Sequence, residues 1–179
     1  RWPGVIRPGL VTSTLISGED FAPTMLEIAG VAPPEEMSGV SFLKLLQGNA
    51  SFVERTYIFT ARVPHGGDGG LYPNIAASVF DLSRSVRSHQ PVQPIDSQSA
   101  PSWLEMKAAF AGGTLAPRFV RAYFTTPRPT YELYNLTTDP NELINLAGNP
   151  QFAQVLLELK QALTEKMVLD WDFLPPPLL

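Results

Sequence analysis

The sequence predicts an α+β fold in which a small antiparallel sheet is packed by helices. Three observations predict it. Helical patterns lie near both ends of the chain, strand patterns lie between them, and the two kinds do not alternate as they do in a βαβ series. The 179 residues are 44% hydrophobic, and a chain of this length buries roughly 70% of its unfolded surface. We therefore expect a folded core.

The composition excludes several classes of protein. Charged residues make up 17% of the chain and the formal net charge is −4, which argues against a disordered tail and against nucleic-acid binding. No apolar run approaches the ~20 residues of a membrane span. The chain has no cysteine, so it offers no disulfide, thiolate ligand or cysteine nucleophile. It opens at Arg1 without a methionine, which we interpret as a boundary inside a longer protein.

A helix is expected over residues 17–29. Ser17 is the candidate N-cap, and Glu19 and Asp20 follow in the first turn, where the helix dipole favours acids. We interpret Asp20 as a capping acid rather than a catalytic one. Apolar residues recur at helical spacing, at Phe21, Met25, Ile28 and Ala29. Gly30 then supplies the C-terminal stop.

The middle of the chain favours short elements separated by glycine and proline. Residues 65–70 hold four glycines and must form a loop. Hydrophobic, β-branched and aromatic runs predict strands, and proline at position 101 suits a helix start. In chain order we expect a short helix over 41–47, a strand over 57–61, weaker strands over 75–80 and 83–87 around a turn at Asp81, a helix over 101–110 and a strand over 119–125.

The C-terminal third carries the clearest patterns. Residues 131–136 alternate in polarity and predict a strand. Two helix starts are expected next, because a capping residue precedes proline in Asp139-Pro140 and in Asn149-Pro150. The second opens an amphipathic helix over 150–168. Its apolar stripe consists of Phe152, Val155, Leu156, Leu159, Leu163 and Met167.

Candidate site chemistry is concentrated in the glycine-rich loop. His65 lies three residues after Arg62, and an arginine with a histidine can hold a sulfate, phosphate or carboxylate. A solvated loop with an ordinary histidine is the alternative. The other histidine, His89, stands near Arg84 and Arg87, which favours a solvated strand edge. The carboxylates are dispersed and predict no metal site.

Several stretches resemble the sulfatase family. Residues 131–147, YELYNLTTDPNELINLA, resemble its C-terminal "ELY-D-L-x-x-DP-x-E-x-x-N-L" string. Residues 1–4 (RWPG), 19–30 (EDFAPTMLEIAG) and 38–43 (SGVSFL) are similar to family strings that precede it. Within the family the likeness is to the heparan N-sulfatases, or sulfamidases, through a histidine-bearing loop before Tyr72-Pro73 and the PVQPID string at 91–96.

The resemblance implies a division of labour along a longer parent chain. Residues 1–50 would be the end of the α/β catalytic domain, and residues 51–179 the C-terminal subdomain. The family hydrolyses sulfate esters or N-sulfate groups with a formylglycine and a calcium ion, and those groups would lie upstream of Arg1. This chain would hold no catalytic or metal residue and would be inactive alone. His65, and with it Arg62, would help to line the substrate pocket.

A second string resembles the formylglycine signature C/S-x-P-S-R itself. It is Ser99-Ala100-Pro101-Ser102-Trp103, in which Trp103 replaces the arginine. The resemblance to the family identifies this string as an element of the C-terminal region and not as the nucleophile site.

The resemblance also implies partners. They are a sulfated sugar, namely N-sulfoglucosamine of heparan-type glycans, the upstream sulfatase catalytic domain and, as a possibility, a second copy in a homodimer; the parent would be exported. Two other interpretations stay open. One is a phosphatase or phosphodiesterase of the same alkaline-phosphatase superfamily, which the upstream nucleophile would distinguish. The other is a non-catalytic glycan-binding module, against which the net charge of −4 argues.

Overall fold

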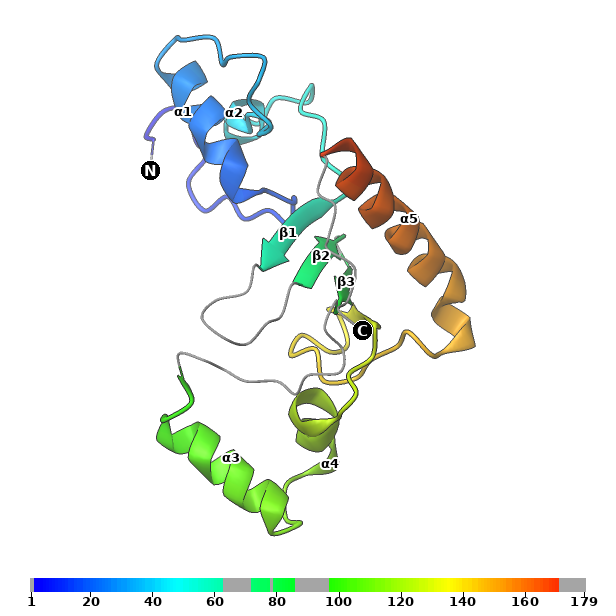
Figure 1. The fold of residues 1–179 in the computed structure, drawn as a ribbon. Helices are drawn as coiled ribbons and strands as arrows, with labels where there is room; N and C mark the ends of the chain where they lie inside the picture. The colour runs from blue at the N-terminus through cyan, green and yellow to red at the C-terminus, as the bar shows by residue number, and fades with distance from the viewer. Residues whose placement is uncertain (1, 63–71, 78, 86–96, 171–179) are drawn as a thin grey trace. The chain divides into compact units, whose positions relative to one another are not determined.

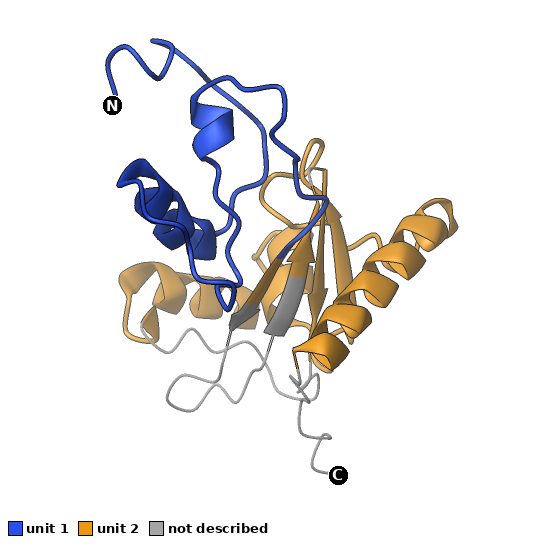
Figure 2. Cartoon of the chain, turned by 90° about the horizontal axis from the view of Figure 1, so that it is seen from above, with its two compact units in different colours: residues 1–58 blue, residues 59–179 orange. Residues whose placement is uncertain are grey.

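The computed structural model describes residues 2–62, 72–77, 79–85 and 97–170 (Figure 1). The chain divides into two compact units, Arg1–Ile58 and Phe59–Leu179 (Figure 2). Within the described residues, no helix combines the length and the apolar character that crossing a membrane requires. The expected boundary after residue 50 stays a prediction about the family's domains.

The first unit is built on the helix expected after Ser17. A 3-10 turn, η1 (Gly18–Asp20), leads into α1 (Phe21–Ile28), and α2 (Leu43–Leu46) follows where a short helix was expected. The Ser17 amide donates to the Asp20 carboxylate at 2.8 Å, which fixes the start. This confirms Ser17 as the N-cap and Asp20 as a capping acid.

Gly30 ends α1 as expected. Its φ of 76° lies in the left-handed region that glycine adopts without strain. The Gly30 amide donates to the Glu27 carbonyl at 3.0 Å and the Val31 amide to the Leu26 carbonyl at 2.9 Å. This pair of bonds is a Schellman motif, which satisfies carbonyls that the helix end leaves free.

The second unit is a four-stranded sheet with a helix packed on it. The strands are β1 (Ile58–Arg62), β2 (Tyr72–Ala76), β3 (Phe80–Arg84) and β4 (Tyr131–Asn135), in the order β1-β2-β3-β4. The pairings of β2 with β3 and of β3 with β4 are antiparallel. The α5 helix (Ala153–Leu169) packs against β2 and β3 (Figure 1). The predicted α+β class is confirmed.

The core of this unit is one row of aliphatic side chains across the sheet. Ile75 pairs with Leu82, and Leu82 with Leu133; all three side chains are 0% exposed. Leu159 and Leu163 of α5 are also buried. A one-residue slip would turn this row to the other face, so its burial fixes the register.

This register corrects the expected turn at Asp81. Asp81 lies inside β3, paired with Ala76 on one side and Tyr134 on the other. The reversal falls instead between β2 and β3, where the Ala77 amide donates to the Phe80 carbonyl at 2.8 Å. The turn-forming tendency of aspartate is overridden because Leu82 must lie in the buried row.

The helix expected over 150–168 is confirmed. Asn149 caps a 3-10 turn, η4 (Pro150–Phe152), by accepting the Gln151 amide at 3.0 Å, and α5 continues from it. The Phe152 ring contacts that of Phe80 edge-on at 5.9 Å. The Lys160 ammonium lies 4.3 Å from the centre of the Tyr131 ring. These two contacts attach this part of the chain to the sheet at Phe80 of β3 and at Tyr131 of β4.

The helix start expected at Asp139-Pro140 is wrong. The Asp139 carboxylate does accept two amides, from Leu143 at 2.8 Å and Ile144 at 2.7 Å. However, Glu142 has a φ of 54°, which a helix cannot contain. The segment is then tied to β4, because the Leu146 amide donates to the Leu133 carbonyl at 2.7 Å.

The strand expected over 119–125 is also wrong. After α3 (Pro101–Ala111), which confirms the predicted helix, the chain forms α4 (Pro117–Phe119) and a π-helical turn, η3 (Val120–Phe124). The Phe124 ring stacks on Trp103 at 5.4 Å and on Phe110 at 4.3 Å. Packing on α3 therefore overrides the β-propensity of this segment.

Candidate functional site

The two residues predicted for the substrate pocket are Arg62 and His65. Arg62 is the last residue of β1. His65 lies outside the described residues, as do His89 and Arg87. Arg84, expected at a solvated strand edge, places its Nη1 3.9 Å from the Met167 sulfur of α5. It therefore belongs to the packed side of the sheet.

The other side of β3 and β4 is polar and buried. Glu132 is 6% exposed and accepts two hydrogen bonds, from Arg128 at 2.8 Å and from the Tyr134 hydroxyl at 2.9 Å. Glu132 and Tyr134 are two residues apart on β4 and so share a face. The alternation of the sequence around 131–136 indicated this face, but nothing in it indicated that the acid would be buried.

Two carboxyl groups near this network have altered acidity. Burial raises the pKa of Asp81 from 3.8 to about 6, and the charge of Glu142 adds to the shift. Burial also raises the pKa of Glu142, with contributions from Asp139 and Glu132. The pKa of Tyr134 is raised too, first by burial and then by Glu132. These groups therefore keep their protons to a higher pH than exposed groups of the same kind do.

The first unit is organised around the Asp20 carboxylate. Besides the Ser17 amide it accepts the Val40 amide at 2.7 Å and forms an ion pair with Arg55. Arg55 also lies 3.7 Å from Glu19. Asp20 is 2% exposed. A capping role accounts for its contact with Ser17 but not for those with Val40 and Arg55. No sequence pattern indicates the role of Arg55.

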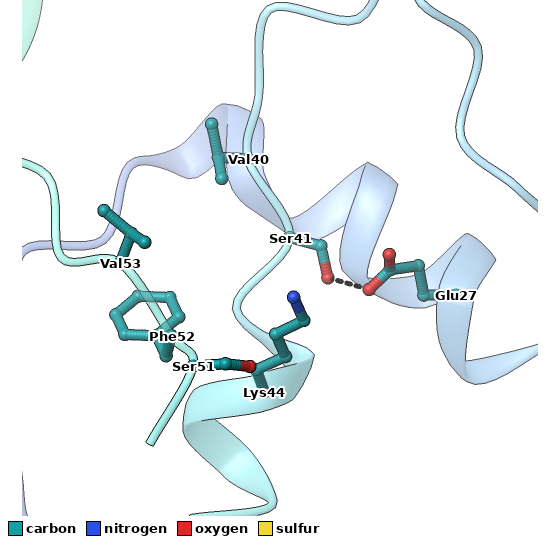
Figure 3. Close-up of a pocket in the computed structure, with 7 residues that line it drawn as sticks. All are labelled: Glu27, Val40, Ser41, Lys44, Ser51, Phe52 and Val53. Carbon is teal, nitrogen blue, oxygen red and sulfur yellow. Dashed lines mark hydrogen bonds between the residues drawn. The ribbon is translucent and has the colours of Figure 1, made fainter. Parts of the chain in front are cut away.

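A cavity of about 280 Å³ lies between α1, α2 and the segment after α2 (Figure 3). Its polar groups are the Glu27 carboxylate, the Lys44 ammonium and two serine hydroxyls. Ser41 donates to Glu27 at 2.5 Å, which joins the chain before α2 to α1. The lining residues are Glu27, Val40, Ser41, Lys44, Ser51, Phe52 and Val53. The Glu27 carboxylate of the cavity already has a partner within the unit.

A protein metal site needs several ligand side chains close together. Among the residues that the structure describes, no three His, Asp or Glu side chains come together as ligands. The two buried acids Asp20 and Glu132 instead bind arginine, tyrosine or backbone amides.

Comparison with known proteins places these features in a family. The family model described as "N-sulphoglucosamine sulphohydrolase, C-terminal" matches residues 1–61. An ulvan-active sulfatase of Formosa agariphila is 33% identical over 91% of this chain and 27% of its own length. An N-acetylglucosamine-6-O-sulfatase of Bacteroides thetaiotaomicron is 24% identical over 96% of this chain and 25% of its own. The chain thus spans about a quarter of the length of these relatives.

Solved structures share the fold. One, in complex with its substrate D-glucosamine-2-N,6-O-disulfate, has a TM-score of 0.56 at 21% identity and covers 93% of this chain and 27% of that one. A phosphonate monoester hydrolase from Silicibacter pomeroyi has a TM-score of 0.57 at 18% identity, with coverage of 94% and 28%. Taken with the sequence matches, the family follows: this chain belongs to the sulfatases and corresponds to a C-terminal portion of one.

Proposed function

We propose that residues 1–179 complete a hydrolase that removes sulfate from a sulfated sugar. The observation that carries the proposal is the match of residues 1–61 to the C-terminal N-sulphoglucosamine sulphohydrolase model. The names of the relatives, an ulvan-active sulfatase and an N-acetylglucosamine-6-O-sulfatase, support sulfate-ester chemistry. Our proposal for the substrate is N-sulfoglucosamine at the end of a heparan-type glycan.

The role of this chain is to line part of the substrate pocket. Arg62 is the last residue of β1 and His65 follows three residues later, so the two basic side chains lie close together in the sequence. A guanidinium binds two oxygens of a sulfate at once, and a protonated imidazole adds a third charge-assisted hydrogen bond. Together they would orient the anionic end of the sugar.

The groups that cleave sulfate are proposed to come from the catalytic region ahead of this chain. The family resemblance implies a formylglycine and a calcium ion. The sequence has no cysteine that could become formylglycine, and the buried acids Asp20 and Glu132 are engaged with protein partners. The Ser99–Trp103 string does not fit either, since Pro101 starts α3 and Trp103 stacks on Phe124. No catalytic step is therefore assigned to a residue of this chain.

Activity assays of the chain alone and of the whole protein test the proposal. The chain alone and the whole protein, with its catalytic region ahead of residue 1, are assayed for sulfate release from N-sulfoglucosamine and from glucosamine 6-sulfate. We expect no turnover by the chain alone and turnover of N-sulfoglucosamine by the whole protein. Sulfate release by the chain alone would contradict the division of labour. Turnover of the 6-sulfate only would contradict the N-sulfate assignment and leave the sulfatase assignment in place.

Arginine substitutions test the pocket in the same assay. Arg62→Ala should lower kcat/KM for the sulfated sugar by about tenfold or more, the loss of one charge-assisted contact. Arg121→Ala is the matched control, because Arg121 is exposed on η3. Equal kcat/KM values for the two variants would contradict the proposal that Arg62 lines the pocket.

A second candidate function is phosphoryl or phosphonyl transfer. The fold likeness to a phosphonate monoester hydrolase, with a TM-score of 0.57, favours keeping it in the test. Adding p-nitrophenyl phosphate and a phosphonate monoester to the substrate set separates the two. Hydrolysis of these esters without sulfate release would support the second candidate over the first.

A further inference from the structure

The aromatic rings that join α3 to η3 are partly open to solvent. Trp103, Phe110 and Phe124 are here called the α3 ring cluster. The Phe124 ring stacks on Trp103 with an interplanar angle of 8° and on Phe110 with one of 16°. Neither α3 nor η3 has a buried residue, and Phe110 is 42% exposed. The cluster therefore offers an aromatic surface to a ligand.

A basic side chain lies on the same side of α3 as these rings. At 100° per residue, Lys107 and Phe110 are only about 40° and about 20° from Trp103 around the helix. Glu105, the one acid of α3, is about 160° away. Lys107 is exposed, and no carboxylate of the described residues forms an ion pair with it. A positive charge thus accompanies the rings, in a chain whose net charge is −4.

This combination fits a sulfated sugar. The C–H groups on one face of a pyranose ring carry partial positive charge, and they pack on the negative face of an aromatic ring. A lysine ammonium forms charge-assisted hydrogen bonds with sulfate oxygens. An apolar protein surface placed here would instead bury the Lys107 charge without a partner, which costs free energy.

We propose that the α3 ring cluster and Lys107 bind a sugar residue of a sulfated glycan chain, with the pyranose on the rings and a sulfate on the ammonium. This inference rests on the proposed function, because a sulfatase that acts at the end of a glycan also meets the rest of that chain. Phe124 supports the two rings of α3 from the η3 side. The surface adds affinity for a glycan chain over a single sugar.

Calorimetric titration of the whole protein measures this binding. The probe is a heparin tetrasaccharide whose terminal sugar carries no N-sulfate, so that hydrolysis does not disturb the titration. Phe110→Leu keeps an apolar side chain but removes the aromatic face, and Lys107→Gln removes the charge. Each should raise Kd about threefold to tenfold, the loss of one contact. An unchanged Kd for either variant would overturn the proposal.

Two further variants are matched controls. Ala108→Glu changes the net charge by the same amount as Lys107→Gln, but position 108 is exposed and lies about 140° from Trp103 around α3. Its Kd should stay near that of the wild type, and an equal rise would reduce the effect to long-range charge and overturn the proposal. Phe110→Tyr keeps the ring and should bind like the wild type. Melting temperatures show that each variant is folded.

A desulfated tetrasaccharide separates the two parts of the surface. It should bind more weakly than the sulfated probe, and equally to the wild type and to Lys107→Gln, because it has no sulfate for the ammonium. An equal effect of Lys107→Gln on both probes would overturn the assignment of Lys107. Sedimentation of the same samples tests a protein occupant. A wild-type dimer that Phe110→Leu dissociates, with an unchanged Kd for the tetrasaccharide, would assign the surface to a second copy and overturn the proposal.

Sulfate release from N-sulfoglucosamine is measured on the same wild-type sample. Tetrasaccharide binding that depends on Lys107 and Phe110, without sulfate release, would refute the proposed function and leave this binding surface in place. Sulfate release together with a Kd that neither substitution changes would overturn the binding surface and leave the proposed function in place.

Discussion

The buried Asp20 carboxylate forms an ion pair with Arg55, which lies 35 residues further along the chain. The pair ties the start of α1 to the segment that leads into β1. Asp20 also accepts the Val40 amide, so three separate segments meet at one carboxylate. A residue that the sequence suggested as a cap is therefore the centre of a hydrogen-bonded network.

Replacing Asp20 should weaken the first unit. Asp20→Asn removes the charge that faces Arg55, and breaking one side of a buried pair should cost about 3 kcal/mol of unfolding free energy. Asp170→Asn is the control, because its pair with Lys166 is solvent-exposed and should contribute less than about 0.5 kcal/mol. Urea unfolding measures both. A loss as small for Asp20→Asn as for the control would show that the network does not hold the unit.

Gly39 should tolerate no side chain. A Cβ at this position would collide with the backbone carbonyl of Glu19, and a backbone cannot rotate away as a side chain can. Gly39→Ala should therefore cost about 2 kcal/mol or more. Gly18→Ala is the control, because nothing lies within 4 Å of an added Cβ there. Similar unfolding midpoints for the two variants would mean that the close approach of residues 19 and 39 is absent in solution.

The buried Asp81 should give the second unit an unusual pH dependence. Its pKa is raised to about 6, so the folded state holds the proton more tightly than the unfolded state. The resulting stabilisation is complete below about pH 4 and is lost as the pH rises through about 6. At 1.36 kcal/mol per pKa unit the loss is roughly 3 kcal/mol at most.

Comparison with Asp81→Asn isolates this effect. From about pH 4 to about pH 7, the wild type should lose stability relative to the variant, which cannot ionise at position 81. Glu165→Gln, on the exposed side of α5, should show a nearly constant difference over the same range. Urea unfolding at each pH is the measurement. If the wild type became more stable relative to Asp81→Asn as the pH rises, the raised pKa of Asp81 would be contradicted.

The stacked rings of Trp103, Phe110 and Phe124 should hold η3 on α3. Phe124→Ala removes both stacking contacts and should cost about 1–2 kcal/mol, since the ring is half-buried. With Trp2 and Trp171 replaced by phenylalanine, the emission of Trp103 should also shift to longer wavelength. Leu104→Ala, exposed on α3, is the control. Unchanged emission in Phe124→Ala would mean that this stacking is not formed.

The sequence patterns were sufficient to predict the helices and strands that short-range interactions determine. The α1 and α5 helices follow from caps and helical spacing, and β1 and β4 follow from β-rich runs. The errors share a different cause. Residues 119–125 have strand propensity, but their rings pack on α3. Asp139 accepts amides as a helix cap would, but Glu142 takes a left-handed φ.

The candidate site was less predictable than the fold. Arg55 reaches Asp20 only through the folded chain, and no spacing in the sequence marks it. The Glu132–Tyr134 pair follows from the two-residue repeat of β4, but its burial depends on residues outside that strand. His65 and Arg62 were selected as cations beside glycines, and their role in the pocket stays a prediction.

The histidine pair tests the central claim most directly. The whole protein is prepared as wild type, His65→Ala and His89→Ala, and kcat/KM is measured for sulfate release from N-sulfoglucosamine. The chain has only these two histidines, so each variant controls for the other. A pocket role predicts a loss of about tenfold or more for His65→Ala and near wild-type activity for His89→Ala. Equal activity of His65→Ala and wild type would contradict the claim that this chain forms part of the sulfate pocket.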